Sequence, residues 1–148
     1  MIDIEVGGVY RAVAPGHDEA AAALVLVTGV DEATQSVEVT LLSPDLEFGS
    51  SLDLVLTGDE IGRGYDLLVE SDVFGYVWAS QLDRWIGRVD AGLLAALGGL
   101  RAGGVVGRAV GGPAVVGRSD PRWEFKQQEL RRLQILSADC TSALVGRR

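Results

Sequence analysis

The sequence contains very few of the residues that crosslink a chain or bind metal through sulfur or imidazole. Of 148 residues, one is a cysteine, Cys140, and one is a histidine, His17. A single cysteine excludes a disulfide within the chain and a cysteine-based metal site. It also fits a reducing cytoplasm, where thiols stay reduced. We therefore expect a cytoplasmic protein with no metal and no cofactor.

Long apolar runs are absent as well. No stretch reaches the roughly 18 apolar residues that a membrane-spanning helix needs. The first residues, MIDIEVGG, are acidic and lack the basic-then-apolar order of a signal peptide. With 47% hydrophobic and 23% charged residues, the composition is typical of a globular chain. We expect no membrane contact and one domain, or one small domain with an appendage.

Positive charge is scarce. The 13 Lys and Arg residues face 21 Asp and Glu residues, which gives a net charge of −8. The first 60 residues contain one basic residue, Arg11, and Lys126 is the only lysine. Affinity for nucleic acids comes mostly from cations that displace counterions. The net charge therefore disfavours RNA binding unless the basic residues gather on one surface. The simplest interpretation of the acidic residues is a solvated acidic surface.

Short apolar or alternating segments dominate the first eighty residues. Turn-forming stretches such as Pro15-Gly16 and Thr57-Gly58 separate them. The candidate strands are residues 8–14, 24–27, 36–42, 52–56, 65–69 and 76–79. Closely spaced strands without long helices between them predict a small antiparallel barrel or sandwich. They argue against a doubly wound α/β sheet.

The pattern changes after residue 89. Asp90 can cap a helix over residues 91–100. Residues 101–119 are rich in glycine and valine, which indicates a linker whose valines can add an edge strand. We expect a mainly β or α+β fold with a barrel domain at 1–100, this linker, and a helical extension at 120–148.

The extension begins with Asp120-Pro121, a cap followed by proline at the first helical position. Its apolar residues recur at spacings of three and four and form one stripe: Leu130, Leu133, Leu136, Cys140 and Leu144. This pattern predicts an amphipathic helix. The helix can pack on its own barrel, or its leucines can bind a partner.

Aromatic residues make up only 6% of the chain. We expect most of them in the core, because strand aromatics at alternating positions usually pack there: Tyr65, Phe74, Tyr76 and Trp78. Trp85 is the expected exception. It lies between Arg84 and Arg88 on a short strand, where it can stack on a base or another ligand.

The order of these segments resembles the MazF/PemK-like toxins, small SH3-like barrels of bacterial toxin–antitoxin systems. GGVYRAVAP resembles their opening strand, residues 24–27 their second strand, and residues 37–43 their third. VWASQLDRWIGRVDAGLLAAL, residues 77–97, carries the strongest resemblance, a strand and turn that lead into a leucine-rich helix. The resemblance covers roughly residues 5–100, and the C-terminal extension lies beyond it.

The resemblance implies a metal-independent endoribonuclease that cleaves single-stranded RNA. The family usually has an arginine just before the second strand, often followed by proline, and a hydroxyl residue at the end of the third. Here Ala22 and Ala23 stand at the first position, and Ser43 keeps the hydroxyl. Alanine can neither bind a phosphate nor donate a proton, so Arg11 or Arg63 must substitute if the chemistry persists.

His17, followed by two acids, is a further candidate, because histidine beside carboxylates can act as a general base. The catalytic candidates are therefore Ser43, Arg11 and His17, and the binding candidates are Arg63, Arg84, Trp85 and Arg88. Two functions remain open. We favour a catalytically degenerate barrel that binds a partner and is dimeric, and the alternative is a toxin endoribonuclease regulated by an antitoxin.

Overall fold

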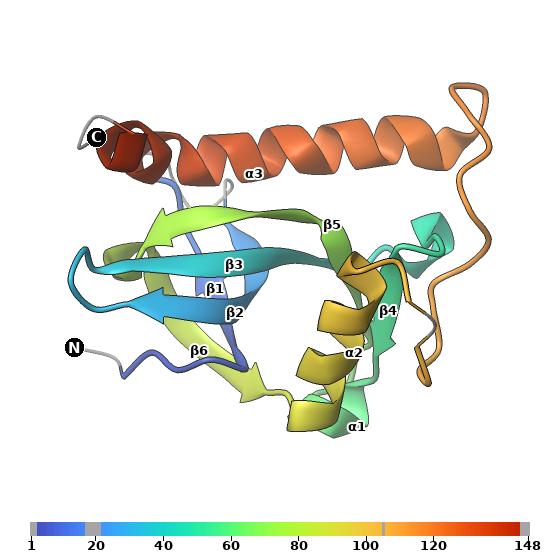
Figure 1. The fold of residues 1–148 in the computed structure, drawn as a ribbon, viewed down its shortest axis with the longest axis horizontal. Helices are drawn as coiled ribbons and strands as arrows, with labels where there is room; N and C mark the ends of the chain where they lie inside the picture. The colour runs from blue at the N-terminus through green and yellow to red at the C-terminus, as the bar shows by residue number, and fades with distance from the viewer. Residues whose placement is uncertain (1–2, 17–21, 105, 146–148) are drawn as a thin grey trace.

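A computed structural model describes residues 3–16, 22–104 and 106–145 of the chain (Figure 1). The strands are β1 (Gly8–Ala12), β2 (Ala23–Asp31), β3 (Ser36–Ser43), β4 (Asp53–Leu56), β5 (Leu67–Trp78) and β6 (Leu82–Arg88). The helices are α1 (Gly58–Ile61), α2 (Ala91–Arg101) and α3 (Pro121–Val145), with short 3₁₀ turns η2 (Leu46–Phe48) and η3 (Ala79–Gln81). The expected antiparallel, mainly β fold with two C-terminal helices is confirmed.

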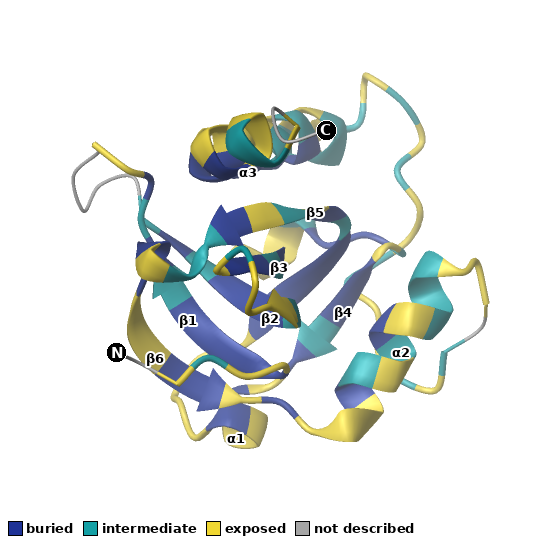
Figure 2. Cartoon of the chain, turned by 60° about the vertical axis from the view of Figure 1, so that its left-hand side comes forward, coloured by how far each residue is buried: buried dark blue, intermediate teal, exposed yellow. Residues whose placement is uncertain are grey.

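The strands form one antiparallel sheet in the order β4-β5-β3-β2-β1-β6. Successive side chains on a strand point to opposite faces, so the curved sheet has a core on each side. On β1, Val9 packs in one core and Tyr10 in the other, and Leu42 and Leu41 divide in the same way on β3. Helix α2 covers the core of Val9, and α3 covers the core of Tyr10 (Figure 2).

Two of the expected strands are halves of one. The sequence predicts residues 65–69 and 76–79 as separate strands, but β5 runs without a break from Leu67 to Trp78 through Glu70, Ser71 and Asp72. Glu70 is buried there because Lys126 of α3 donates to it, and the Ser71 hydroxyl donates to the Leu52 carbonyl. Tyr65 precedes the strand. Strand β2 also continues four residues past its expected end and makes a hairpin with β3.

Helix α2 follows the expected signals. The Asp90 side chain accepts a hydrogen bond from the Leu93 amide at 2.9 Å, which caps the first turn. Leu93 and Leu97 are buried against the sheet and α1. This helix therefore closes the core on its side of the sheet.

The glycine-rich segment between α2 and α3 is irregular but attached to β4. The Val55 amide donates to the Ala109 carbonyl at 3.0 Å, and the Gly111 amide donates to the Asp53 carbonyl at 2.8 Å. One isolated bridge joins Val110 to β4, in place of the edge strand that its valines suggested. Backbone contact with Gly49 leaves no room for a Cβ at Gly111.

Helix α3 begins at Pro121 as expected and crosses the sheet over β5 (Figure 1). Leu133 and Leu136 are buried in the core shared with the sheet, and Leu130 packs against it. The Gln81 side chain also donates to the Leu136 carbonyl at 2.8 Å. Of the two expectations for this helix, the structure therefore has the packing on its own barrel, which occupies the face that carries Leu133 and Leu136.

The aromatic residues do not fill the core as expected. Phe74 is 49% exposed and Tyr76 is 46% exposed. Their neighbour Gly75 lies under Leu133, so the alternation of β5 turns Phe74 and Tyr76 to the outer face. Trp85 is 52% exposed, which confirms the one exception that we predicted.

Candidate functional site

Arg11 and the position of Ala22 and Ala23, both expected at an active site, lie near one end of β1, β2 and β3. A cavity of about 220 Å³ lies there. Cross-strand pairing of Arg11 with Leu24, and of Leu24 with Leu42, places these side chains on one face of the sheet. The lining consists of Arg11, Ala22, Ala23, Leu24, Leu42, Pro44 and Arg132.

Arg11 makes a two-pronged ion pair in this region. Its Nε donates to Asp83 Oδ1 at 2.9 Å and its Nη2 donates to Asp83 Oδ2 at 2.7 Å. These hydrogen bonds lower the pKa of the Asp83 carboxyl below its usual range. An approaching phosphate must therefore compete with a carboxylate already bound in the geometry that guanidinium groups prefer.

Ser43 lies at the end of β3, as the resemblance implies, but it is 0% exposed. Its Oγ accepts a hydrogen bond from the Asp45 amide at 3.1 Å, which stabilises the turn after the strand. The hydroxyl serves the local backbone and does not face solvent.

Arg132 of α3 is the residue of this cavity that sequence reasoning missed. Its Nη2 donates to the Ala22 carbonyl at 3.3 Å, and its Nη1 donates to Glu129 at 3.0 Å. A guanidinium from the C-terminal helix thus lies beside the position where the resemblance expects an arginine. No local signal indicates this contact, because 110 residues separate the two positions.

The other expected residues lie outside this cavity. Arg84 pairs across the strands with Arg11, and Arg88 forms an exposed ion pair with Glu5 at 3.5 Å. Arg63 donates to the Ile86 carbonyl at 2.9 Å and so joins the loop after α1 to β6. Arg63 is therefore not among the residues that line the cavity of Arg11. His17 lies outside the described residues.

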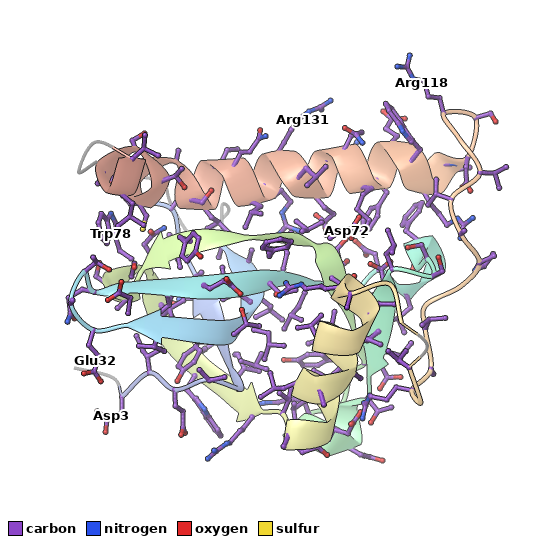
Figure 3. The ribbon with its side chains drawn as sticks, in the orientation of Figure 1. Asp3, Glu32, Asp72, Trp78, Arg118 and Arg131 are labelled. Atoms are coloured by element: carbon purple, nitrogen blue, oxygen red, sulfur yellow. The ribbon has the colours of Figure 1, made fainter. Side chains whose placement is uncertain are left out.

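A second cluster lies buried between α3 and the sheet. Lys126 Nζ lies 2.9 Å from Asp53, 3.1 Å from Glu70 and 3.1 Å from Asp72. Figure 3 shows Asp72 on the sheet below α3. Burial lowers the pKa of Lys126, but the nearby carboxylates outweigh it and raise that pKa above its ordinary value. The only lysine of the sequence is therefore a charged link between helix and barrel.

Glu70 and Glu129 complete this cluster. Burial raises the pKa of Glu70 to about 9, the charge of Lys126 opposes the rise, and the neighbouring Glu129 adds to it. Glu70 Oε2 and Glu129 Oε1 are both buried and have no hydrogen-bond partner. Burial and the neighbouring Glu129 therefore favour the protonated form of Glu70, while the charge of Lys126 favours the ionised form.

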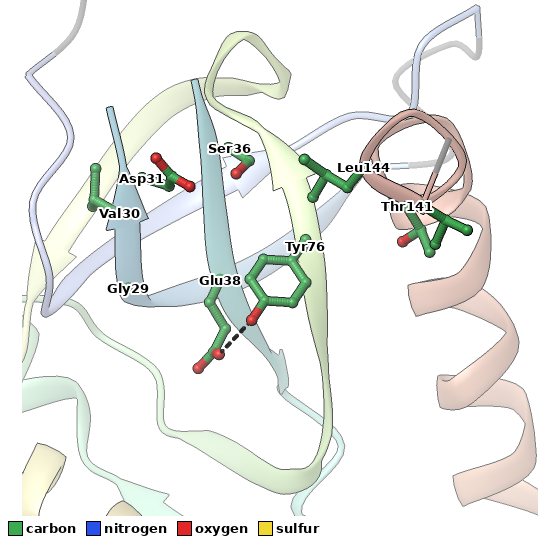
Figure 4. Close-up of a pocket in the computed structure, with 9 residues that line it drawn as sticks. Gly29, Val30, Asp31, Ser36, Glu38, Tyr76, Thr141 and Leu144 are labelled. Atoms are coloured by element: carbon green, nitrogen blue, oxygen red, sulfur yellow. Dashed lines mark hydrogen bonds between the residues drawn. The ribbon is translucent and has the colours of Figure 1, made fainter. Parts of the chain in front are cut away.

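A groove with a volume of about 560 Å³ lies at the β2–β3 hairpin (Figure 4). It is bounded by this hairpin, by Tyr76 of β5 and by the last turns of α3. Asp31 and Glu38 supply two carboxylates, and Val30, Leu144 and Val145 supply apolar surface. Sequence reasoning did not identify this groove, because its walls come from segments that are distant in the chain.

Within the described parts of the chain, no three His, Cys, Asp or Glu side chains are arranged to hold a metal ion. None of the helices there combines the length and apolarity needed to cross a membrane.

The fold is similar to solved bacterial toxin structures. The Mycobacterium tuberculosis toxin MazF-mt6 superposes with a TM-score of 0.51 at 18% identity, over 65% of this chain and 93% of that one. A mycobacterial endoribonuclease in complex with its cognate antitoxin also has a TM-score of 0.51, at 14% identity, over 71% of this chain and 98% of its own. No protein-family model matches the sequence, and no curated protein does.

These coverages mean that nearly all of each toxin has a counterpart here, while about a third of this chain has none. Residues 102–148, which contain the linker and α3, make up a similar share of the sequence. The similarity concerns the fold, because fewer than one residue in five is identical. The chain therefore has a MazF-like fold.

Proposed function

We propose that this protein is a MazF-like barrel that binds a protein partner and does not cleave RNA. One observation carries the proposal: Ser43 and Arg11, two of the three groups expected to do catalysis, are engaged in structural contacts. The Ser43 hydroxyl is buried under its own turn, and the Arg11 guanidinium binds Asp83. Ala22 stands where the resemblance expects the arginine.

The chemistry of RNA cleavage explains why these contacts matter. Without a metal, the enzyme must stabilise the charge that develops on the phosphorus oxygens with preorganised donors. It must also move a proton to and from the ribose and leaving oxygens. Ala22 can do neither, and the net charge of −8 adds long-range repulsion of the substrate. Together these features support binding without cleavage.

Arg132 favours a second candidate, a metal-independent endoribonuclease. Its guanidinium lines the same cavity as Arg11 and donates to the carbonyl of Ala22. In this alternative, the C-terminal helix supplies the cation that the second strand has lost. Bidentate contact between guanidinium and phosphate suits that role.

One experiment separates the two candidates. Purified full-length protein is incubated with a long single-stranded RNA in the presence of EDTA, and the products are resolved on a sequencing gel. We expect intact RNA at high protein concentration. Discrete cleavage that Arg132→Ala abolishes would establish the nuclease instead. Arg131→Ala is the matched control, because Arg131 is an exposed arginine on the same helix that points away from the sheet (Figure 3).

The binding partner is a protein in this proposal, and the protein itself is a cytoplasmic homodimer. The antitoxin bound to the mycobacterial endoribonuclease supports a protein partner, since the two chains share a fold. Light scattering of the purified protein measures the mass of the assembly directly. A mass of one chain across a wide concentration range would contradict the homodimer.

A further inference from the structure

The β2–β3 hairpin end of the molecule is acidic, and two cavities open there on either side of the hairpin. The first is the 560 Å³ groove, and the second, of about 420 Å³, shares Val30, Asp31 and Ser36 with it. The carboxylates that line the two are Asp3, Asp31, Glu32 and Glu38. Neither cavity has a lysine or arginine among its described lining residues. Asp3 and Glu32 lie together at this end in Figure 3.

Glu38 is positioned at the wall of the larger groove by three neighbours. Its Oε1 accepts from the Thr28 hydroxyl at 2.7 Å, and its Oε2 accepts from the Tyr76 hydroxyl at 3.4 Å (Figure 4). Arg101 approaches Oε1 only to 3.7 Å, while its guanidinium stacks 4.3 Å from the centre of the Phe74 ring. The carboxylate is therefore oriented by two hydroxyl donors and by a longer ion pair with Arg101, which is not among the residues that line the groove.

Asp31 faces the same groove and is held by the hairpin turn. Its Oδ1 accepts from the amides of Ala33 at 3.0 Å and Thr34 at 3.4 Å, an arrangement typical of an Asx turn. The cross-strand pairs Asp31–Ser36 and Gly29–Glu38 place both acids on one end of the β2–β3 ladder. Preorganised carboxylates of this kind bind a cation with little loss of side-chain entropy.

The remaining lining is apolar and aromatic. Tyr76 is 46% exposed, and Val30 and Val145 are exposed beside it, with Leu144 between helix and sheet. An exposed tyrosine ring beside two carboxylates suits a guanidinium group, which can pair with the acids and stack on the ring. The apolar part suits the aliphatic side chains next to that cation.

We propose that this groove is the docking surface for a basic segment of a protein partner, an arginine side chain flanked by apolar residues. The inference rests on the proposed function, since it names the class of partner that the barrel binds. Charge complementarity carries it: two positioned carboxylates, an aromatic ring and apolar walls form one groove on a protein of net charge −8.

The test uses the full chain and a fluorescent short peptide of alternating arginine and leucine, with fluorescence anisotropy as the readout. The test variant is Asp31→Asn/Glu38→Gln, which keeps the acceptors for the turn amides and for Thr28 but removes both charges. The matched control is Glu47→Gln/Asp59→Asn, which makes the same change in net charge at exposed sites on η2 and α1.

We expect the basic peptide to bind the wild-type protein and the control variant with affinities within about twofold of each other. The test variant should bind about tenfold more weakly or worse, because charge-assisted hydrogen bonds are lost. A glutamate–leucine peptide should not bind. Equal weakening by both double variants, or no effect of the test variant, would overturn the proposal, because binding would then reflect overall charge alone.

The alternative occupant of the groove is the chain's own segment after Val145, Gly-Arg-Arg. A chain truncated after Val145 tests it. We expect unchanged peptide affinity after this truncation. Binding that appears only after truncation would assign the groove to the chain's own C-terminal arginines and refute a separate partner.

The RNA assay decides the proposed function independently. Cleaved RNA with intact peptide binding would overturn that function alone, and intact RNA with no peptide binding would overturn the groove alone.

Discussion

Replacement of Lys126 by methionine removes the ammonium group that joins α3 to the sheet while keeping a similar side-chain length. Its Nζ contacts Asp53, Glu70 and Asp72 at 2.9–3.1 Å. Asp53 and Glu70 are fully buried, so water cannot take the place of the lost cation without opening the helix. The carboxyl groups that Lys126 contacted are then left without their shared hydrogen-bond donor.

Removal of one partner from a buried ion pair costs about 3–5 kcal/mol, because it leaves an uncompensated buried charge. The free energy of unfolding of a typical domain is only about 5–15 kcal/mol. For a chain of this size, each kcal/mol lowers the melting temperature by about 2–4 °C, so Lys126→Met should lower it by roughly 6–20 °C.

The assay is urea unfolding followed by circular dichroism at neutral pH, with Arg131→Met as the control. The control loses one exposed cation from the same helix and should stay within about 0.5 kcal/mol of the wild-type protein. Equal free energies of unfolding for the two variants would refute the reasoning. They would mean that the Lys126 cluster does not hold α3 on the barrel.

Three further changes probe the same architecture. Glu70→Gln mimics the protonated carboxyl. The folded-state pKa of Glu70 is raised to about 9 from 4.5, so the wild-type protein loses stability as the pH rises between these values, and the variant's relative stability should increase over that range in urea titrations. Leu136→Ala should cost about 2–5 kcal/mol by leaving a cavity under α3, whereas the exposed Ile135→Ala should change the free energy of unfolding by less than about 1 kcal/mol. Gly49→Ala should cost about 1–3 kcal/mol, because its Cβ would meet linker backbone at 2.7 Å, while Gly98→Ala in α2 meets nothing and should stabilise by up to about 1 kcal/mol. Thermal unfolding of each pair checks these two expectations.

Local signals predicted much of the fold. The Asp90 cap, the leucine spacing after it and the Asp120-Pro121 start each act within a few residues, and both helices begin where these signals place them. The β1 and β3 strands likewise follow from their alternation. The break predicted within β5 was wrong, because the polar run at residues 70–72 is matched by a helix more than fifty residues later.

The candidate sites depended far more on contacts between distant segments. Sequence reasoning located Ser43 and Arg11, but it could not tell that Ser43 is buried or that Asp83 binds Arg11. It also missed Arg132 and the acidic groove at Glu38, since neither has a local motif.

By itself, the sequence determined the antiparallel strand pattern, the two C-terminal helices, the exposure of Trp85 and the acidic charge, because these depend on short-range periodicity, capping and composition. Only the tertiary structure decided that α3 packs on its own barrel and that its Lys126 pairs with three carboxylates. It also decided that the cavity of Arg11 and Arg132 and the groove of Asp31 and Glu38 form at different ends of β2 and β3. The physical reason is that such contacts depend on which strands pair and how far the sheet curves, and the free energy that selects them is spread over the whole core.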